Sequence, residues 1–147
     1  TEGWSMEDSV ILARELAVRG VDVVDCSAGG IRGAAAFRAN DAGKPFGKGA
    51  ERPPGFQVPY ADRIRKEAAV KTMAVGVIVD PHQAEAILKE GRADLVALGR
   101  EIMYNPFWTL HAAQALDADP DCAMWPNQHG WAVQRRREII AQNEGTI

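Results

Sequence analysis

Three residues of this sequence, Gly76, Gly99 and Arg100, have types and positions that suit the binding of an anion, and Val75 stands beside the first of them. Gly99 and Arg100 follow one apolar run, and Val75 and Gly76 lie near the end of an earlier one. A glycine has no Cβ, so its backbone N–H can approach a phosphate closely, and the planar guanidinium of arginine suits a phosphate dianion. We call these four residues the anion corner. A purely structural role stays open, because glycines at strand ends also serve tight turns and an arginine there can pair with a carboxylate.

Other residue types that carry chemistry give weaker indications. His82, His111 and His129 each lack a Cys, Asp or Ser partner at catalytic spacing, so surface or packing roles are favoured over catalysis. Cys26 and Cys122 lack any CxxC or Cys/His ligand spacing, so we expect free thiols and no metal site. Neither glycine pattern matches GxGxxG or a P-loop, which argues against a Rossmann site or a nucleotide hydrolase.

Three apolar runs predict the strands that would position the anion corner. The runs cover residues 21–27, 70–78 and 93–98, and they alternate with helical patterns over 5–20, 59–69, 80–91 and 107–116. The predicted N-caps are Ser5 for the first helix, Asp80 for the third and Asn105 for the fourth. Continuous apolar runs are typical of a parallel sheet covered by helices, so the fold class is α/β. Because parallel strands end at the same edge of a sheet, the residues after each strand should gather there.

The length predicts only part of a closed barrel. A full (β/α)8 barrel needs roughly 250 residues, and this chain supplies about three of its eight units. The chain has no initiator Met and a helix pattern begins almost at once, which predicts a piece of a longer protein. We expect residues 1–116 to form the C-terminal half of a barrel, residues 30–57 to form a long glycine-rich loop within it, and 117–147 to form a tail.

Composition excludes several classes of partner. The 147 residues are 46% hydrophobic and 25% charged, with a net charge of −3, so a long basic field for nucleic acid is absent. The one basic run, Arg135 to Arg137, is followed by Glu138 and is typical of a solvated helix face. No apolar stretch is long enough to cross a membrane and no signal-peptide pattern opens the chain, so we expect a cytoplasmic location without membrane partners.

Several motifs together resemble the second half of bacterial old yellow enzymes. They occur in the family's order over nearly the whole chain, at residues 23–30, 55–61, 74–78 and 93–100 and at Asn105-Pro106. The resemblance implies a TIM barrel whose strands six to eight lie here, with FMN as cofactor and NAD(P)H as hydride donor. It also implies that the substrate-gripping His pair, the proton-donating Tyr and the other residues near the flavin ring lie upstream. The resemblance therefore assigns no catalytic residue to this chain.

The same resemblance gives the anion corner a ligand. Val75 and Gly76 match the segment after strand seven whose backbone approaches the FMN phosphate. Gly99 and Arg100 match the pair after strand eight, whose arginine pairs with that phosphate. The interpretation from residue chemistry and the resemblance therefore select the same corner, to which the resemblance adds Val75.

The tail contains a second match to the family. Residues 125–131 resemble its C-terminal Pro-x-Gln-aromatic segment, in which a later Arg or Trp reaches the neighbouring subunit's active site. Trp131 has that place here, as a substrate-pocket residue or as a packing anchor. His129 stands where many members have Tyr, which weakens the match locally.

Two functions follow as hypotheses. In the first, the parent protein is an FMN-dependent NAD(P)H oxidoreductase that reduces activated C=C bonds. This chain then supplies the phosphate corner, requires the N-terminal half of the barrel, forms a homo-oligomer and is inactive alone. In the second, the chain is a non-catalytic half-barrel module for phosphate binding or assembly, whose exposed strand edges would force it to associate.

Overall fold

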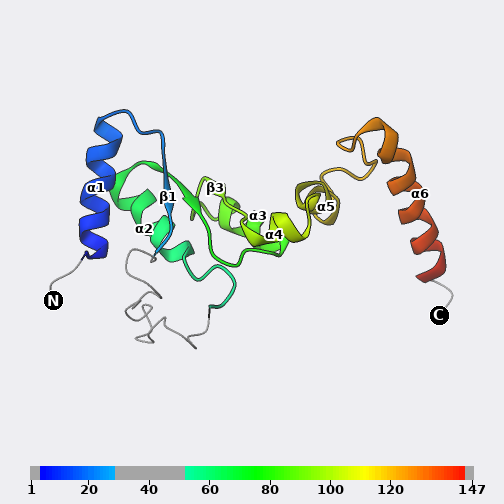
Figure 1. Cartoon of the computed structure of the whole chain (residues 1–147), viewed down its shortest axis with the longest axis horizontal. Coiled ribbons are helices and arrows are strands. Elements are labelled where there is room, and N and C mark those ends of the chain that lie inside the picture. The colour runs from blue at the N-terminus through cyan, green and yellow to red at the C-terminus, as the bar shows by residue number, and fades with distance from the viewer. Residues whose placement is uncertain (1–3, 29–51, 145–147) are drawn as a thin grey trace.

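The computed structural model describes residues 4–28 and 52–144, in which helices and strands alternate (Figure 1). The order is α1 (Met6–Val18), β1 (Val23–Cys26), α2 (Val58–Ala68), β2 (Lys71–Ala74), α3 (Pro81–Lys89), β3 (Leu95–Val96), α4 (Arg100–Tyr104), α5 (Trp108–Ala115) and α6 (Asn127–Glu144). The predicted α/β class is confirmed. The predicted 30–57 loop lies largely outside the described residues, which resume at Arg52.

The three strands form one parallel sheet in the order β1-β2-β3. Thr72 and Ala74 of β2 are fully buried on the face that α2 and α3 cover. The opposite face carries a row formed by Asp25, Met73 and Leu95, which are direct neighbours in the strand register. Leu95 is 48% exposed and Asp25 is exposed, so the helices within residues 4–28 and 52–144 cover this sheet on one face.

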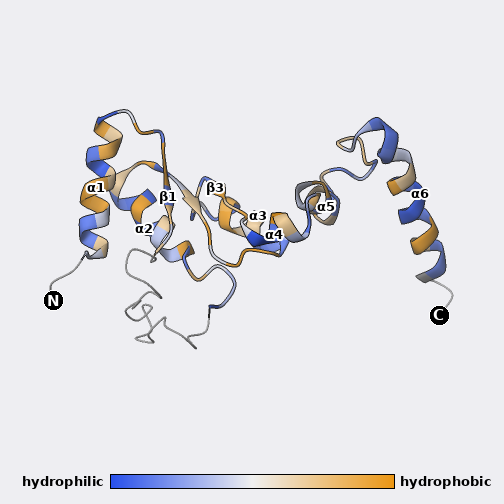
Figure 2. Cartoon of the chain, viewed as in Figure 1, coloured by the Kyte–Doolittle hydropathy of each residue, from blue (hydrophilic) through white to orange (hydrophobic). Residues whose placement is uncertain are grey.

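Local sequence signals explain where the helices begin. Ser5 and Asp8 form a capping box, in which the Ser5 hydroxyl accepts from the Asp8 backbone N–H and the Asp8 carboxylate accepts from the Ser5 N–H. Asp80 caps α3 by accepting from the backbone N–H of His82, with Pro81 at the first helical position. Apolar residues concentrate in the strands and on the inner sides of these helices (Figure 2). Both predicted helix starts are confirmed.

Three predicted elements differ from the structure. The strand expected over residues 70–78 ends at Ala74, because the positive φ values of Gly76 and Val77 are incompatible with a continuing strand. The strand expected over residues 93–98 pairs only at Leu95–Val96, although backbone hydrogen bonds from Asp94 and Ala97 to β2 extend the contact on either side. The helix expected over 107–116 is preceded by a short separate helix, α4, and it begins at Trp108 with Phe107 as its N-cap. Asn105 was predicted as that cap, and this was wrong, because its carbonyl instead closes a turn with the Trp108 N–H.

The tail packs on α5 and then leaves the body of the molecule. Trp125 is buried against Phe107 and His111, with ring centroids 5.5 and 5.4 Å apart. The buried Asp119 carboxylate accepts backbone hydrogen bonds from Ala123 and Met124 and so shapes the turn. Beyond it, α6 extends away from the sheet (Figure 1) and alternates hydrophilic and hydrophobic turns (Figure 2). No described helix is long and apolar enough to cross a membrane.

Candidate functional site

All four residues of the anion corner follow neighbouring parallel strands at their carboxyl ends. Val75 and Gly76 continue directly from β2, while Gly99 and Arg100 come three and four residues after the end of β3. A hydrogen bond of 2.8 Å from the Ala97 N–H to the Ala74 carbonyl continues the pairing beyond the strands. The structure therefore brings the two pairs to the same edge of the sheet.

The two glycines of the corner have different surroundings. A Cβ on Gly99 would have no heavy atom within 4 Å, so the space beside its backbone is open. A Cβ on Gly76 would lie 3.1 Å from the ring of Phe56 and 3.3 Å from the Gln57 Cβ, and Gly76 has a φ of +128°. The fold itself therefore requires glycine at position 76, whereas the open space at position 99 is available to a ligand.

The backbone after β2 is strained at the residue that follows Gly76. Val77 has a φ of +53°, in the left-handed region that a β-branched residue rarely adopts. Such conformations cost on the order of 1–3 kcal/mol and persist where surrounding contacts impose them. Two successive positive φ values change the course of the chain at this edge of the sheet.

Arg100 is the cation of the corner. It is exposed at the first position of α4 and forms no hydrogen bond or ion pair within the part of the chain that the structure describes. A guanidinium without a carboxylate partner keeps all its donors available to an incoming anion. This geometry disfavours the structural alternative, in which Arg100 would pair with a neighbouring carboxylate.

One set of contacts at this edge was missed from the sequence. Residues 55–57, which we call the 55–57 turn, lie against the ends of both β1 and β2. The Gly55 N–H donates to the Gly76 carbonyl at 2.7 Å, and the Ala28 N–H donates to Oε1 of Gln57 at 2.6 Å. Gln57 is only 6% exposed. The signal in the sequence was a polar amide placed among apolar residues immediately before a predicted helix.

The two cysteines are free thiols, as their spacing predicted. Both are buried. Burial, with a smaller contribution from the negative charge of Asp25, raises the pKa of the Cys26 thiol to about 11. Cys26 therefore carries almost no thiolate at neutral pH and is a poor nucleophile. Among the described residues, no group of His, Cys, Asp or Glu side chains is arranged to hold a metal ion.

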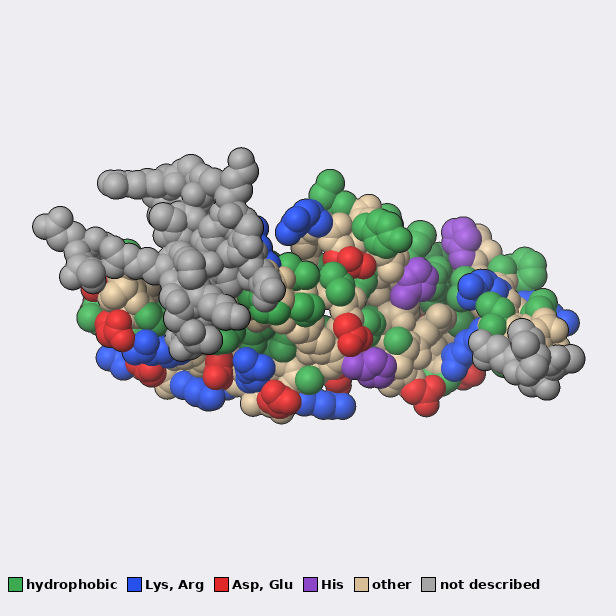
Figure 3. Space-filling model, turned by 90° about the horizontal axis from the view of Figure 1, so that it is seen from below, with side chains coloured by type: hydrophobic (Ala, Val, Ile, Leu, Met, Phe, Trp, Pro, Cys, Tyr) green, Lys and Arg blue, Asp and Glu red, His purple; other side chains and the backbone are tan. Residues whose placement is uncertain are grey.

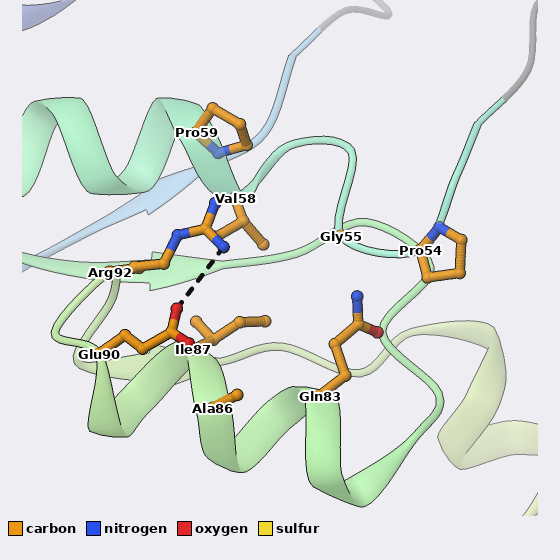
Figure 4. Close-up of a pocket in the computed structure, with 9 residues that line it drawn as sticks. All are labelled: Pro54, Gly55, Val58, Pro59, Gln83, Ala86, Ile87, Glu90 and Arg92. Atoms are coloured by element: carbon orange, nitrogen blue, oxygen red, sulfur yellow. Dashed lines mark ion pairs between the residues drawn. The ribbon is translucent and has the colours of Figure 1, made fainter.

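A cavity of about 230 Å³ lies elsewhere, between α2 and α3 (Figure 4). Val58 and Ile87 contribute apolar walls, and Glu90 and Arg92 form a 4.0 Å ion pair at one end. It belongs to the helical side of the sheet and includes none of the four anion-corner residues. Of the three residues of the 55–57 turn, Gly55 is the one that lines this cavity.

The remaining predicted residues lie away from the corner. Trp131 is on α6 and is 70% exposed. All three histidines are exposed, and within the described part of the chain a side-chain hydrogen bond joins His111 Nδ1 to Asn105 Oδ1 at 3.1 Å. On the face shown in Figure 3, acidic and basic side chains alternate and form no continuous basic field.

Comparisons with known proteins agree on one family. Residues 5–119 match the model of the NADH:flavin oxidoreductase / NADH oxidase family. The chain is 38% identical over 130 residues to an NADPH dehydrogenase of Geobacillus sp. (strain WCH70), covering 88% of the chain and 34% of the relative. It is 36% identical over 118 residues to the NADPH dehydrogenase of Bacillus subtilis (strain 168), covering 80% of the chain and 31% of the relative. The chain thus spans about a third of the length of these relatives.

Proposed function

Because the chain belongs to the NADH:flavin oxidoreductase / NADH oxidase family, we propose that it forms the FMN-phosphate corner of a longer FMN-dependent oxidoreductase, the parent protein. The observation that carries this proposal is the pairing of open space at Gly99 with an exposed, unpartnered Arg100. β1, β2 and β3 would then be strands six, seven and eight of a TIM barrel. In such barrels a phosphate commonly docks at the loops after the last two strands.

The residues of the corner fit a phosphate group. Arg100 would pair with the phosphate, Gly99 would admit it close to the backbone, and Val75 and Gly76 would supply the neighbouring wall. Bound FMN would supply the hydride chemistry, taking reducing equivalents from NAD(P)H and passing them to an activated C=C bond. The contribution of this chain is to hold the cofactor in place, so that its ring is correctly oriented toward groups contributed by the rest of the barrel.

The uncovered face of the sheet supports a parent protein with further strands. Leu95 and Asp25 are exposed there, as expected of side chains that face a barrel interior whose other walls are contributed elsewhere. The groups that bind substrate and donate the proton would come from that other part. Trp131, on the exposed α6, would reach a neighbouring subunit in a homo-oligomer, and the predicted cytoplasmic location remains part of this proposal.

The test is to replace Arg100 in the parent protein. We expect Arg100→Ala to weaken FMN binding by about tenfold to a hundredfold, the range of one charged hydrogen-bonding partner. Riboflavin, which lacks the phosphate, should bind both proteins equally. Arg136→Ala removes an exposed arginine from α6 and serves as the matched control. Unchanged FMN affinity in Arg100→Ala would contradict the proposal.

A second function, a non-catalytic assembly module, is favoured by the same uncovered sheet face. An exposed parallel sheet with free edges promotes association with another chain. Size-exclusion chromatography of the 147-residue chain separates the two cases. A well-behaved monomer would exclude the module, and reduction of cyclohexenone with NADPH by this chain alone would contradict its expected inactivity.

A further inference from the structure

The 55–57 turn connects the two strand ends that border the anion corner. Gln57 receives the Ala28 N–H at the end of β1, while Gly55 donates to the Gly76 carbonyl at the end of β2. Both hydrogen bonds are short, at 2.6 and 2.7 Å, and the Gln57 side chain is almost completely buried. A buried amide that is hydrogen-bonded in this way fixes the relative position of the groups it joins.

The same turn determines the conformation of the wall of the corner. The Phe56 ring occupies the space beside Gly76, where a Cβ would lie 3.1 Å away. Glycine adopts the positive φ of Gly76 readily, whereas the positive φ of Val77 persists only when neighbouring contacts impose it. The turn contacts this segment at Gly76, through the Phe56 ring and through the hydrogen bond from the Gly55 N–H to the Gly76 carbonyl.

We infer that Gln57 is a positioning residue for phosphate binding, which acts by holding the 55–57 turn between the ends of β1 and β2. The inference rests on the proposed function, because the group positioned is the FMN phosphate. Loss of the Gln57 hydrogen bond frees the turn from Ala28, and Phe56 and Gly55 then hold Gly76 less firmly. Phosphate affinity falls, while contacts to the flavin ring, which lie elsewhere in the parent protein, are unaffected.

The experiment compares FMN with riboflavin in variants of the parent protein. The readout is the dissociation constant of riboflavin divided by that of FMN. A general loss of structure would weaken both ligands and leave this ratio unchanged. We expect Gln57→Met to reduce the preference for FMN about fivefold, the effect of one neutral hydrogen bond. If Gln57→Met does not fold, Gln57→Asn takes its place. It retains an amide but is one methylene shorter, and it should give a smaller loss of the preference for FMN. Gln114→Met is the control, because it removes one glutamine hydrogen bond, to Cys122, away from the corner, and it should leave the ratio unchanged.

Each outcome is informative. If Arg100→Ala leaves the ratio unchanged, the phosphate assignment itself is wrong. If Arg100→Ala lowers the ratio but both Gln57 variants match Gln114→Met, the corner binds phosphate and Gln57 does not position it. Equal weakening of FMN and riboflavin in the Gln57 variants also overturns the inference, because it shows a general structural role.

Discussion

The two ends of the parallel sheet differ in whether their charged side chains are paired. At the amino end, Arg65 of α2 donates to both carboxylate oxygens of Asp94, at 2.9 and 3.2 Å, and to the Gly91 carbonyl at 3.0 Å. Asp94 also accepts from the backbone N–H of the fully buried Thr72. At the carboxyl end, Arg100 has no partner among the described residues and the space beside Gly99 is open.

This difference indicates that charged groups at the amino end stabilise the fold and that those at the carboxyl end are available for binding. Groups that satisfy one another, as at the amino end, stabilise the fold and leave nothing for a ligand. Donors that stay unpaired beside open backbone, as at the carboxyl end, contribute little to folding and are available to an anion. The same division between a stabilising and a functional face is general in (β/α)8 barrels. Substitutions of the ion pair at the amino end should therefore change stability, and substitutions of Gly99 and Arg100 should mainly change affinity.

The largest expected effect belongs to Gly76, the carboxyl-end residue that the fold itself requires. Gly76→Ala would place a methyl group against the Phe56 ring and force alanine to a φ of +128°. We expect the free energy of unfolding of the parent protein without FMN to fall by about 3 kcal/mol. Urea unfolding monitored by circular dichroism measures this. A loss below about 1 kcal/mol would show that the turn moves aside easily.

Asp94 should show the second largest effect, without any change in FMN affinity. Asp94→Ala leaves the buried Thr72 N–H without its acceptor and Arg65 without its carboxylate, so we expect a loss of about 2 kcal/mol. Urea unfolding gives the stability, and flavin titration gives the affinity. A marked loss of FMN affinity in the folded variant would contradict the separation between the two ends.

The Asp94 contribution should also depend on pH. Its hydrogen bond with the Arg65 guanidinium holds the pKa of this carboxyl below its ordinary value of 3.8. A pKa that folding lowers contributes stability above the unfolded value and loses it as the pH falls through the folded value. The stability difference between the native protein and Asp94→Ala should therefore be full at neutral pH and shrink below pH 3.8. A difference that stays constant down to about pH 2 would contradict this.

Local and long-range features differed in how well the sequence predicted them. The Ser5 and Asp80 caps were predictable because a cap involves residues within one helical turn. The anion corner was predictable because residues after parallel strands must share an edge. The Arg65–Asp94 ion pair joins residues 29 positions apart on different elements, and no local pattern specifies such a partner. Gln57 was missed for the same reason, because Ala28 lies 29 positions away.

Gly99 provides a smaller and more selective effect. A Cβ on Gly99 would meet no described neighbour, but its φ of −91° and ψ of −96° lie outside the regions that residues with a Cβ favour. We therefore expect Gly99→Ala to lower the free energy of unfolding by only about 1 kcal/mol. FMN affinity should fall about tenfold, or ~1.4 kcal/mol, because the new methyl group occupies space intended for the phosphate. Calorimetric titration with FMN and riboflavin checks this, and an unchanged FMN affinity would show that the open space serves no ligand.

Ala69 should give the smallest effect and tests whether backbone strain alone marks a functional site. It ends α2 at the amino end of the sheet with a φ of +52°, close to the value at Val77, but it lies at the opposite end of the sheet from the anion corner. Glycine removes the Cβ strain, partly offset by greater freedom of the unfolded chain, so Ala69→Gly should stabilise the protein by about 0.5 kcal/mol. Ala86→Gly, inside α3, should instead destabilise it by about 1 kcal/mol. FMN affinity should stay constant in both variants. The strained backbone at Ala69 ends a helix, whereas the strained backbone at Val77 borders the anion corner.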